Sequence, residues 1–290
     1  MKTQLVATVG GGFILTVLQM LTGIVLGPLD VEMPPGTLPW MLLANLLLAG
    51  VLAWYARRAV WTGWRLAAAL FAVSYGIGHA SAFIELYFFP VVLPRPGLLQ
   101  GIFVSSLVPA VLLSPVMVLL TGRWSRAGAA SARAPERSAT EWMARFAACC
   151  IAYVLLYFAA GTIIFPYVQA FYAQLTLPAV STLIMLQLFV RGPLFVAIGF
   201  LIVRMAPATR MEHALAVGIA MSVLGGVVPL LVPNPFLPDY VRWVHLAEVV
   251  CSNLVFGFIV GWLLSGSGRA EPWAPVRREG RSAAGTSQAV

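Results

Sequence analysis

Eight long runs of almost uncharged residues follow one another along the chain and constrain its fold more than any other feature. Most have the roughly 17–25 residues that an α-helix needs to cross the hydrocarbon core of a bilayer. None has the polar alternation of an outer-membrane β-strand. We therefore predict an all-α polytopic integral membrane protein with about eight transmembrane helices. The predicted spans are residues 5–26, 39–55, 66–89, 98–120, 142–165, 179–203, 214–231 and 241–264.

The composition agrees with a protein that is surrounded by lipid. Apolar residues make up 60% of the chain and charged residues only 10%, whereas soluble domains are about 25% charged. The chain thus has too few polar side chains to cover a surface that faces water. The first apolar run has no convincing small-x-small cleavage site before Pro28, so we interpret it as a retained helix and not a signal peptide.

The basic residues predict the orientation of the spans. If the N-terminus lies inside, all but three of the 18 Lys and Arg residues fall in segments on that same side. Cytoplasmic loops of membrane proteins are enriched in Lys and Arg. We therefore expect a protein of the cell membrane (the inner membrane in a bacterium) with both termini in the cytoplasm. We attribute the net charge of +8 to anionic lipid headgroups and not to nucleic acid.

Two polar segments divide the chain. Residues 123–141 are rich in Ala, Ser, Arg and Pro and are predicted to form a cytoplasmic linker between a first membrane half, residues 1–122, and a second, residues 142–264. Residues 265–290 have a similar composition and are predicted to form a disordered cytoplasmic tail. Four spans on each side of the linker would make an internal duplication a parallel repeat. A 4+4 pseudo-repeat is therefore a hypothesis.

Short segments rich in proline and aromatic residues are predicted as the outer loops. One of them covers residues 165–178, between the fifth and sixth spans, and another follows the third span and contains Arg95. We expect these loops to act as stiff caps on the helices.

Five ionisable residues within the spans are the candidate binding residues. His79 and Glu85 lie in the third span, Arg191 in the sixth, and His245 and Glu248 in the eighth. A charge deep in the bilayer costs at least roughly 2.5–3.5 kcal/mol, so it should face the bundle interior and find a partner. We expect Arg191 to pair with Glu85 or Glu248, near the two histidines, and to line a polar pocket that opens outward. Purely structural pairing of Arg191, as a clamp between helices, is the alternative.

Other polar residues have simpler interpretations. Gly192 and Pro193 should weaken the hydrogen-bond ladder directly after Arg191. Arg242 is expected to be an interfacial anchor near the headgroups. His213, near the inner end of the seventh span, is expected to be solvated.

Catalytic and metal-binding signatures are missing from the sequence. It contains no H-E-x-x-H, G-x-S-x-G or Walker motif, and its three cysteines lack C-x-x-C spacing. His245 and Glu248, with their i, i+3 spacing, could present two ligands to one metal. The set is too sparse to predict a metal or a cofactor.

Three hypotheses for the function are left open. The preferred one is a permease-like or ligand-binding protein whose pocket holds a small polar solute or a lipid headgroup. The second is an intramembrane enzyme that acts on a lipid or lipid-linked substrate, with His245 as general base and Glu248 orienting it. The third is a scaffold subunit. The first is preferred because the sequence shows no nucleophile–base pair, and neither the ligand nor the oligomeric state is predicted.

Overall fold

The structure is a computed structural model that describes residues 2–26, 33–88, 98–125, 137–234 and 236–266. Eight of its helices are long and apolar enough to cross a membrane, as the sequence predicts. Five of the eight are continuous α-helices. These are α1 (Lys2–Leu26), α2 (Thr37–Arg58), α5 (Leu98–Leu120), α6 (Ala139–Tyr172) and α11 (Asp239–Leu264).

The remaining three spans are each interrupted by a π-helical turn of five residues. π-helical turns are rare and are found frequently at functional sites. The third span consists of α3 (Gly63–Tyr75), η1 (Gly76–Ala80) and α4 (Ser81–Phe88). The sixth consists of α7 (Val180–Leu186), η3 (Gln187–Arg191) and α8 (Gly192–Met205). The seventh consists of α9 (Arg210–Ser222), η4 (Val223–Val227) and α10 (Val228–Leu231).

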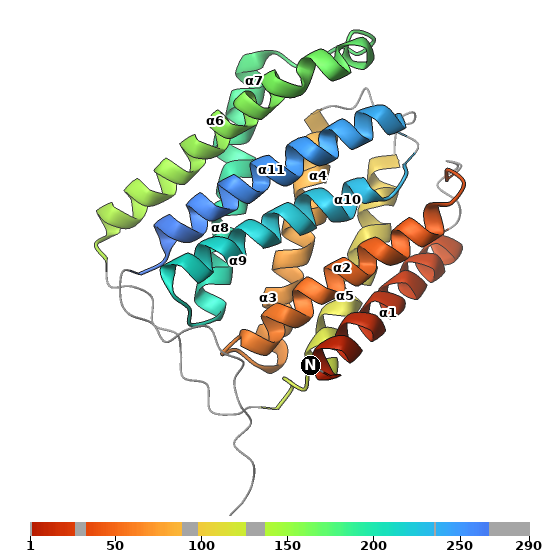
Figure 1. Cartoon of the computed structure of the whole chain (residues 1–290), viewed down its shortest axis with the longest axis vertical. Helices are drawn as coiled ribbons and strands as arrows, with labels where there is room; N and C mark the ends of the chain where they lie inside the picture. Colours follow the sequence, from red (N-terminus) through yellow and green to blue (C-terminus); the bar gives the residue numbers. More distant parts are fainter. Residues whose placement is uncertain (1, 27–32, 89–97, 126–136, 235, 267–290) are drawn as a thin grey trace, which may run out of the picture.

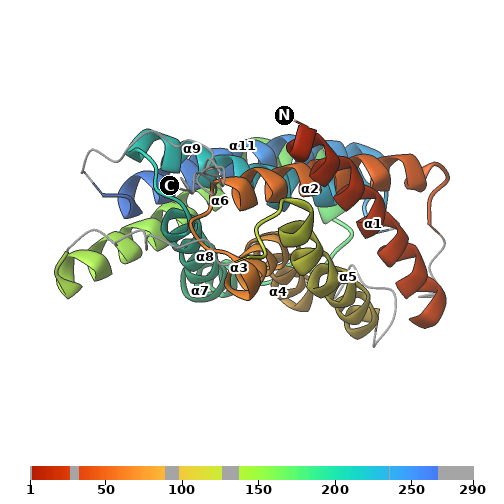
Figure 2. The ribbon, with the colours of Figure 1, turned by 90° about the horizontal axis from the view of Figure 1, so that it is seen from below.

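The spans pack as two neighbouring groups. In the first group α1 packs along α2 and α5, and α3 packs along α5; in the second, α11 packs along α6, α8 and α9. Figures 1 and 2 show α1 and α6 on opposite sides of the bundle. The groups meet where α2 and the third span contact α8 and the seventh span. A buried hydrogen bond crosses this contact, from the Tyr55 hydroxyl to the Ala216 carbonyl, at 2.6 Å.

The start of α1 and the end of α11 lie at the same end of the bundle (Figure 1). We call it the basic end, because Arg58, Arg204 and Arg210 are at the helix termini there. The site described below is nearer the opposite end.

Glycines allow α11 to lie close against α9. Gly257 and Gly261 are four residues apart on α11, the small-xxx-small spacing that lets membrane helices approach closely. A Cβ at Gly257 would lie 2.7 Å from the Cα of Gly218, and one at Gly261 would collide with the His213 carbonyl. This close contact fixes α11, and with it the polar residues at its other end.

Two of the π-helical turns pack against each other. α3 and α9 each have 13 residues and each leads directly into a five-residue π turn. A Cβ at Gly78 in η1 would lie 3.2 Å from the Leu224 carbonyl, and one at Gly225 in η4 would lie 3.7 Å from the Ile77 carbonyl. The two turns therefore contact each other reciprocally, through residues at matching positions.

The prediction of an outer loop at residues 165–178 was wrong in its first part. α6 continues through Pro166 to Tyr172. A proline removes one hydrogen bond from a helix, but Val168 is completely buried just beyond it, and this packing holds the next two turns helical. The other span boundaries lie within a few residues of those predicted. Most of the predicted linker and tail, and the predicted loop that contains Arg95, lie outside the described residues.

Candidate functional site

Arg191 is the buried charge around which the site is built. It is the last residue of η3, and its Nη2 lies 3.3 Å from Glu85 Oε2 on α4. Its Nε and Nη2 donate to the Ser81 hydroxyl at 3.2 and 3.0 Å, and its Nη1 donates to Gln187 Oε1 at 3.4 Å. The predicted pairing of Arg191 with Glu85 is confirmed, and it joins the third and sixth spans.

The π turn of the sixth span follows from the residues after Arg191. Pro193 has no N–H and cannot bond to a carbonyl in the preceding turn, so the ladder is interrupted there. Gly192 leaves room for the wider turn: a Cβ on it would lie 2.7 Å from the Gln187 carbonyl and 3.5 Å from the Cα of Cys150 on α6. The weakened ladder expected at this position is therefore a π turn, and Gln187 and Arg191 are both buried within it.

A layer of aromatic side chains packs against the guanidinium group of Arg191. The Arg191 guanidinium carbon is 5.9 Å from the centre of the Tyr153 ring. Tyr153 is buried and packs against Phe195 and Phe256, with ring centroids 5.3 and 4.8 Å away. These rings separate the polar residues from the apolar core on the side of the basic end.

Gln187 adds a second donor next to Arg191. Its Nε2 is buried, and no hydrogen-bond partner for it is found among the described residues. A buried polar group without a partner costs about 1–3 kcal/mol. The site therefore holds more hydrogen-bond donors than the acceptors around it satisfy.

A second polar cluster joins α11 to the end of α6. His245 Nδ1 lies 2.7 Å from Glu248 Oε2, and His245 Nε2 lies 2.8 Å from the hydroxyl of Tyr172. An ionised carboxylate can only accept, so in a neutral His245 the proton is on Nδ1 and Nε2 accepts from Tyr172. The three side chains form one chain of hydrogen bonds, Glu248–His245–Tyr172.

The two clusters belong to one electrostatic environment. Glu85 and Glu248 both interact electrostatically with Arg191 and with Tyr153. Four of the five predicted binding residues thus lie in one region. The fifth, His79, packs its ring against Tyr75, with centroids 5.5 Å apart. A role in binding remains a prediction for all five.

Ser81, Gln187 and Tyr172 were not predicted as members of the site. Gln187 is four residues before Arg191, so helical spacing alone could have placed it on the same face. Ser81 could not be recognised, because its neighbours depend on how the third and sixth spans pack. Tyr172 was missed because its helix was predicted to end too early.

Two structural expectations were wrong. Arg242 is buried within the protein and is not an exposed anchor: its Nη1 donates to the carbonyls of Leu230 and Leu231 at 2.9 and 3.1 Å, and its Nη2 to Asp239 Oδ1 at 2.8 Å. It therefore satisfies the last carbonyls of the seventh span, which otherwise lack partners. His213 is also buried, with Nε2 3.0 Å from the Ala206 carbonyl, because α11 packs directly over it at Gly261.

Among the residues that the structure describes, no group of three or more His, Cys, Asp or Glu side chains is close enough to hold a metal ion. Comparisons of the chain with protein-family models, with curated proteins and with solved structures find no match.

Proposed function

We propose that the protein is a permease-like or ligand-binding protein of the cell membrane, the inner membrane in a bacterium, with both termini in the cytoplasm. It holds a small polar solute or a lipid headgroup in the outer half of the bilayer, at Arg191. The observation that carries this proposal is the buried Gln187 Nε2 without a partner, beside a buried guanidinium group. A ligand with acceptor oxygens would satisfy both.

The donor-rich chemistry favours a carboxylate, phosphate or carbonyl oxygen on the ligand. A guanidinium group has five N–H donors in a fork that matches such oxygens. Ser81 and Gln187 hold this group from the protein side. Glu85 is the most exposed of its partners and is the one that an incoming anion would displace.

Glu248, His245 and Tyr172 have a supporting role in this proposal. Their hydrogen-bonded chain can accept a proton at one end and release it at the other, which suits a carrier that couples its solute to protons. His245 is the central member, with both ring nitrogens bonded.

A 4+4 pseudo-repeat is also part of the proposal. The equal lengths of α3 and α9, their π turns and the reciprocal contact of Gly78 and Gly225 support it. Two further contacts support the repeat. In the second span α2 contacts η4, and in the corresponding sixth span α8 contacts η1. In a parallel repeat these turns would lie at an axis along the membrane normal, where two interrupted helices can act as hinges.

Mass spectrometry of the purified protein tests the proposal. Wild-type protein purified from a membrane in mild detergent should carry a polar small molecule or lipid that Arg191→Gln lacks. Arg204→Gln is the matched control, because Arg204 is on the same span but at its basic end. The same bound molecules in all three proteins, at equal occupancy, would contradict the proposal.

The chain of Glu248, His245 and Tyr172 also favours the second candidate, an intramembrane enzyme. In enzymes that use a hydroxyl nucleophile, a carboxylate orients an imidazole, and the imidazole takes the proton from the hydroxyl. The three side chains have this arrangement. The sequence predicted the base and its orienting group, and Tyr172 would supply the hydroxyl. An enzyme would turn over a lipid substrate in detergent without any gradient, and Tyr172→Phe would abolish this turnover.

A further inference from the structure

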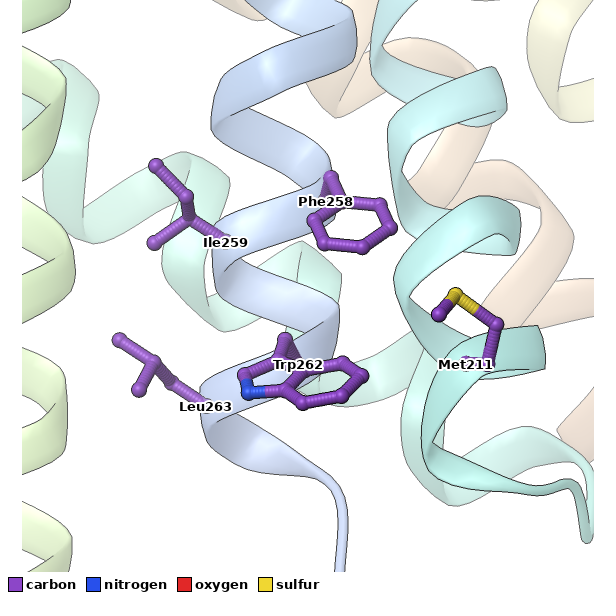
Figure 3. A pocket seen from close by; sticks show the side chains of 5 residues that line it. All are labelled: Met211, Phe258, Ile259, Trp262 and Leu263. Carbon is purple, nitrogen blue, oxygen red and sulfur yellow. The ribbon is translucent and has the colours of Figure 1, made fainter.

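A hollow of about 350 Å³ lies on the surface of α11 near the basic end, lined by Met211, Phe258, Ile259, Trp262 and Leu263. Figure 3 shows Phe258 and Trp262 directed toward Met211 on α9, and Ile259 and Leu263 on the other side of α11. Phe258 and Trp262 stack with ring centroids 6.0 Å apart. The side chains that line the hollow are apolar, so it suits hydrocarbon better than a polar solute.

Three arginines surround the end of α11 beside this hollow. Arg210 Nε donates to the Trp262 carbonyl at 2.9 Å, and its guanidinium carbon lies 4.2 Å from the centre of the Trp262 ring. Arg145 Nη1 donates to the Leu263 carbonyl at 2.7 Å. Arg137 donates to the carbonyls of Leu264 and Ser265. Trp262 and Leu263 therefore line the hollow and also accept hydrogen bonds from the arginine cluster through their carbonyls.

Within the part of the chain that the structure describes, the arginine cluster carries more positive than negative charge. Glu141 pairs with Arg137 and Arg145, at 3.1 and 2.9 Å, and so balances one of the three charges. A second carboxylate near the cluster among the described residues, Glu212, accepts from the backbone and hydroxyl of Thr209 in the capping box of α9. Burial, together with the charges of Arg145 and Arg210, lowers the pKa of Arg137, against the opposing effect of Glu141. An added anion would relieve this repulsion.

We infer that the hollow and the arginine cluster form a binding site for an anionic phospholipid. An acyl chain lies along Phe258, Trp262 and Met211, and the phosphate accepts hydrogen bonds from Arg210 and its neighbours. Basic pockets between membrane helices at the interface are suited to anionic headgroups, and arginine matches the geometry of phosphate oxygens. Trp262 lies 14 residues from Glu248, about 21 Å along α11, so this site is separate from the one at Arg191.

Lipid titration of the full chain in neutral detergent, followed by native mass spectrometry, tests the inference. Dioleoylphosphatidylglycerol should bind more tightly than dioleoylphosphatidylcholine. Arg210→Gln should weaken phosphatidylglycerol binding about fivefold, the size expected for one basic side chain at the membrane surface. Arg65→Gln is the matched control and should change nothing, because Arg65 also stacks on a tryptophan, 4.1 Å from the Trp61 ring, but lies in the first group of spans.

A second variant tests the hollow without changing any charge. Met211 is half exposed, so Met211→Trp can fill the hollow while the fold is preserved, and it should weaken phosphatidylglycerol binding with little change in the melting temperature. This result would support the inference even if Arg210→Gln failed to fold. Equal affinity for the two lipids, or unchanged binding to Met211→Trp, would overturn it. So would glycerol 3-phosphate that competes at the same concentration as the whole lipid.

Discussion

Arg191 and Glu85 form an ion pair whose two members differ in exposure: the arginine side chain is 11% exposed and the glutamate side chain 40%. Arg191 is held on three sides, by Ser81, Gln187 and the ring of Tyr153. Glu85 is the more exposed partner. The positive charge is therefore the fixed part of the site, and the carboxylate is the part that is accessible from outside.

This asymmetry predicts different costs for removing each partner. Arg191→Leu should lower the free energy of unfolding by about 2–3 kcal/mol, less than the 3–5 kcal/mol of a fully buried pair, because Glu85 can regain contact with water. Glu85→Gln should cost more, about 3–5 kcal/mol, because it leaves the buried Arg191 guanidinium group without a compensating charge. Thermal unfolding in detergent measures both. Equal costs for the two substitutions would show that the ion pair is a structural link between the two spans, to which both members contribute equally.

Much of the fold could be predicted because the bilayer tolerates few alternatives. Uncharged runs of sufficient length must be helices, and a deep charge such as Arg191 must find a carboxylate. The end of α6 could not be predicted in this way, since its helical state beyond Pro166 depends on the burial of Val168. Tyr172 was not predicted as a site residue for the same reason.

Packing also explains the other differences from the predictions. Hydropathy predicts the depth of Arg242 and His213 in the membrane but not which helices bury them. Here α10 packs against Arg242, and α11 packs against His213. The π turns are equally hidden from sequence periodicity. Pro193 and Pro229 each lie two residues after a π turn and indicate η3 and η4, but α4, which follows η1, contains no proline.

The hydrogen bond from Tyr172 to His245 predicts a loss of function without a loss of fold. Tyr172→Phe removes the hydroxyl but keeps the ring, so its effect on stability should be near 1 kcal/mol, the net value of one hydrogen bond. Transport or turnover should fall at least about tenfold if the hydroxyl handles a proton. Tyr167→Phe is the matched control, because Tyr167 is on the same helix and is mostly exposed. Equal activity of the two variants would remove Tyr172 from the mechanism.

The contact of α11 with α9 predicts sensitivity to a single methyl group. Gly257→Ala should destabilise the protein by about 1–3 kcal/mol, because the new Cβ would lie 2.7 Å from the Val217 carbonyl. Gly161→Ala on α6 should instead be neutral or stabilise by up to about 1 kcal/mol, since a Cβ there meets nothing within 4 Å. Melting temperatures of the two variants check this difference. A stable Gly257→Ala protein would contradict the close approach of the helices.

The proposed orientation predicts that reporters at two sites are active in the cytoplasm. A reporter that functions only there should give signal when it is fused after Arg133 and after Gly268, because the basic residues favour that side. Western blots of the fusions control for expression. A silent fusion that is nevertheless present at normal levels would show that the orientation or the number of spans is wrong.

The most direct test of a ligand site at Arg191 is an experimental structure of the full chain in lipid nanodiscs that contain the copurified molecule. We predict non-protein density within hydrogen-bond distance of Arg191 and of Gln187 Nε2, with the Glu85 carboxylate either turned away from the guanidinium group or still paired with it beside the ligand. A structure in which Gln187 Nε2 bonds to protein, Arg191 keeps its pair with Glu85, and no other density is present would contradict this prediction.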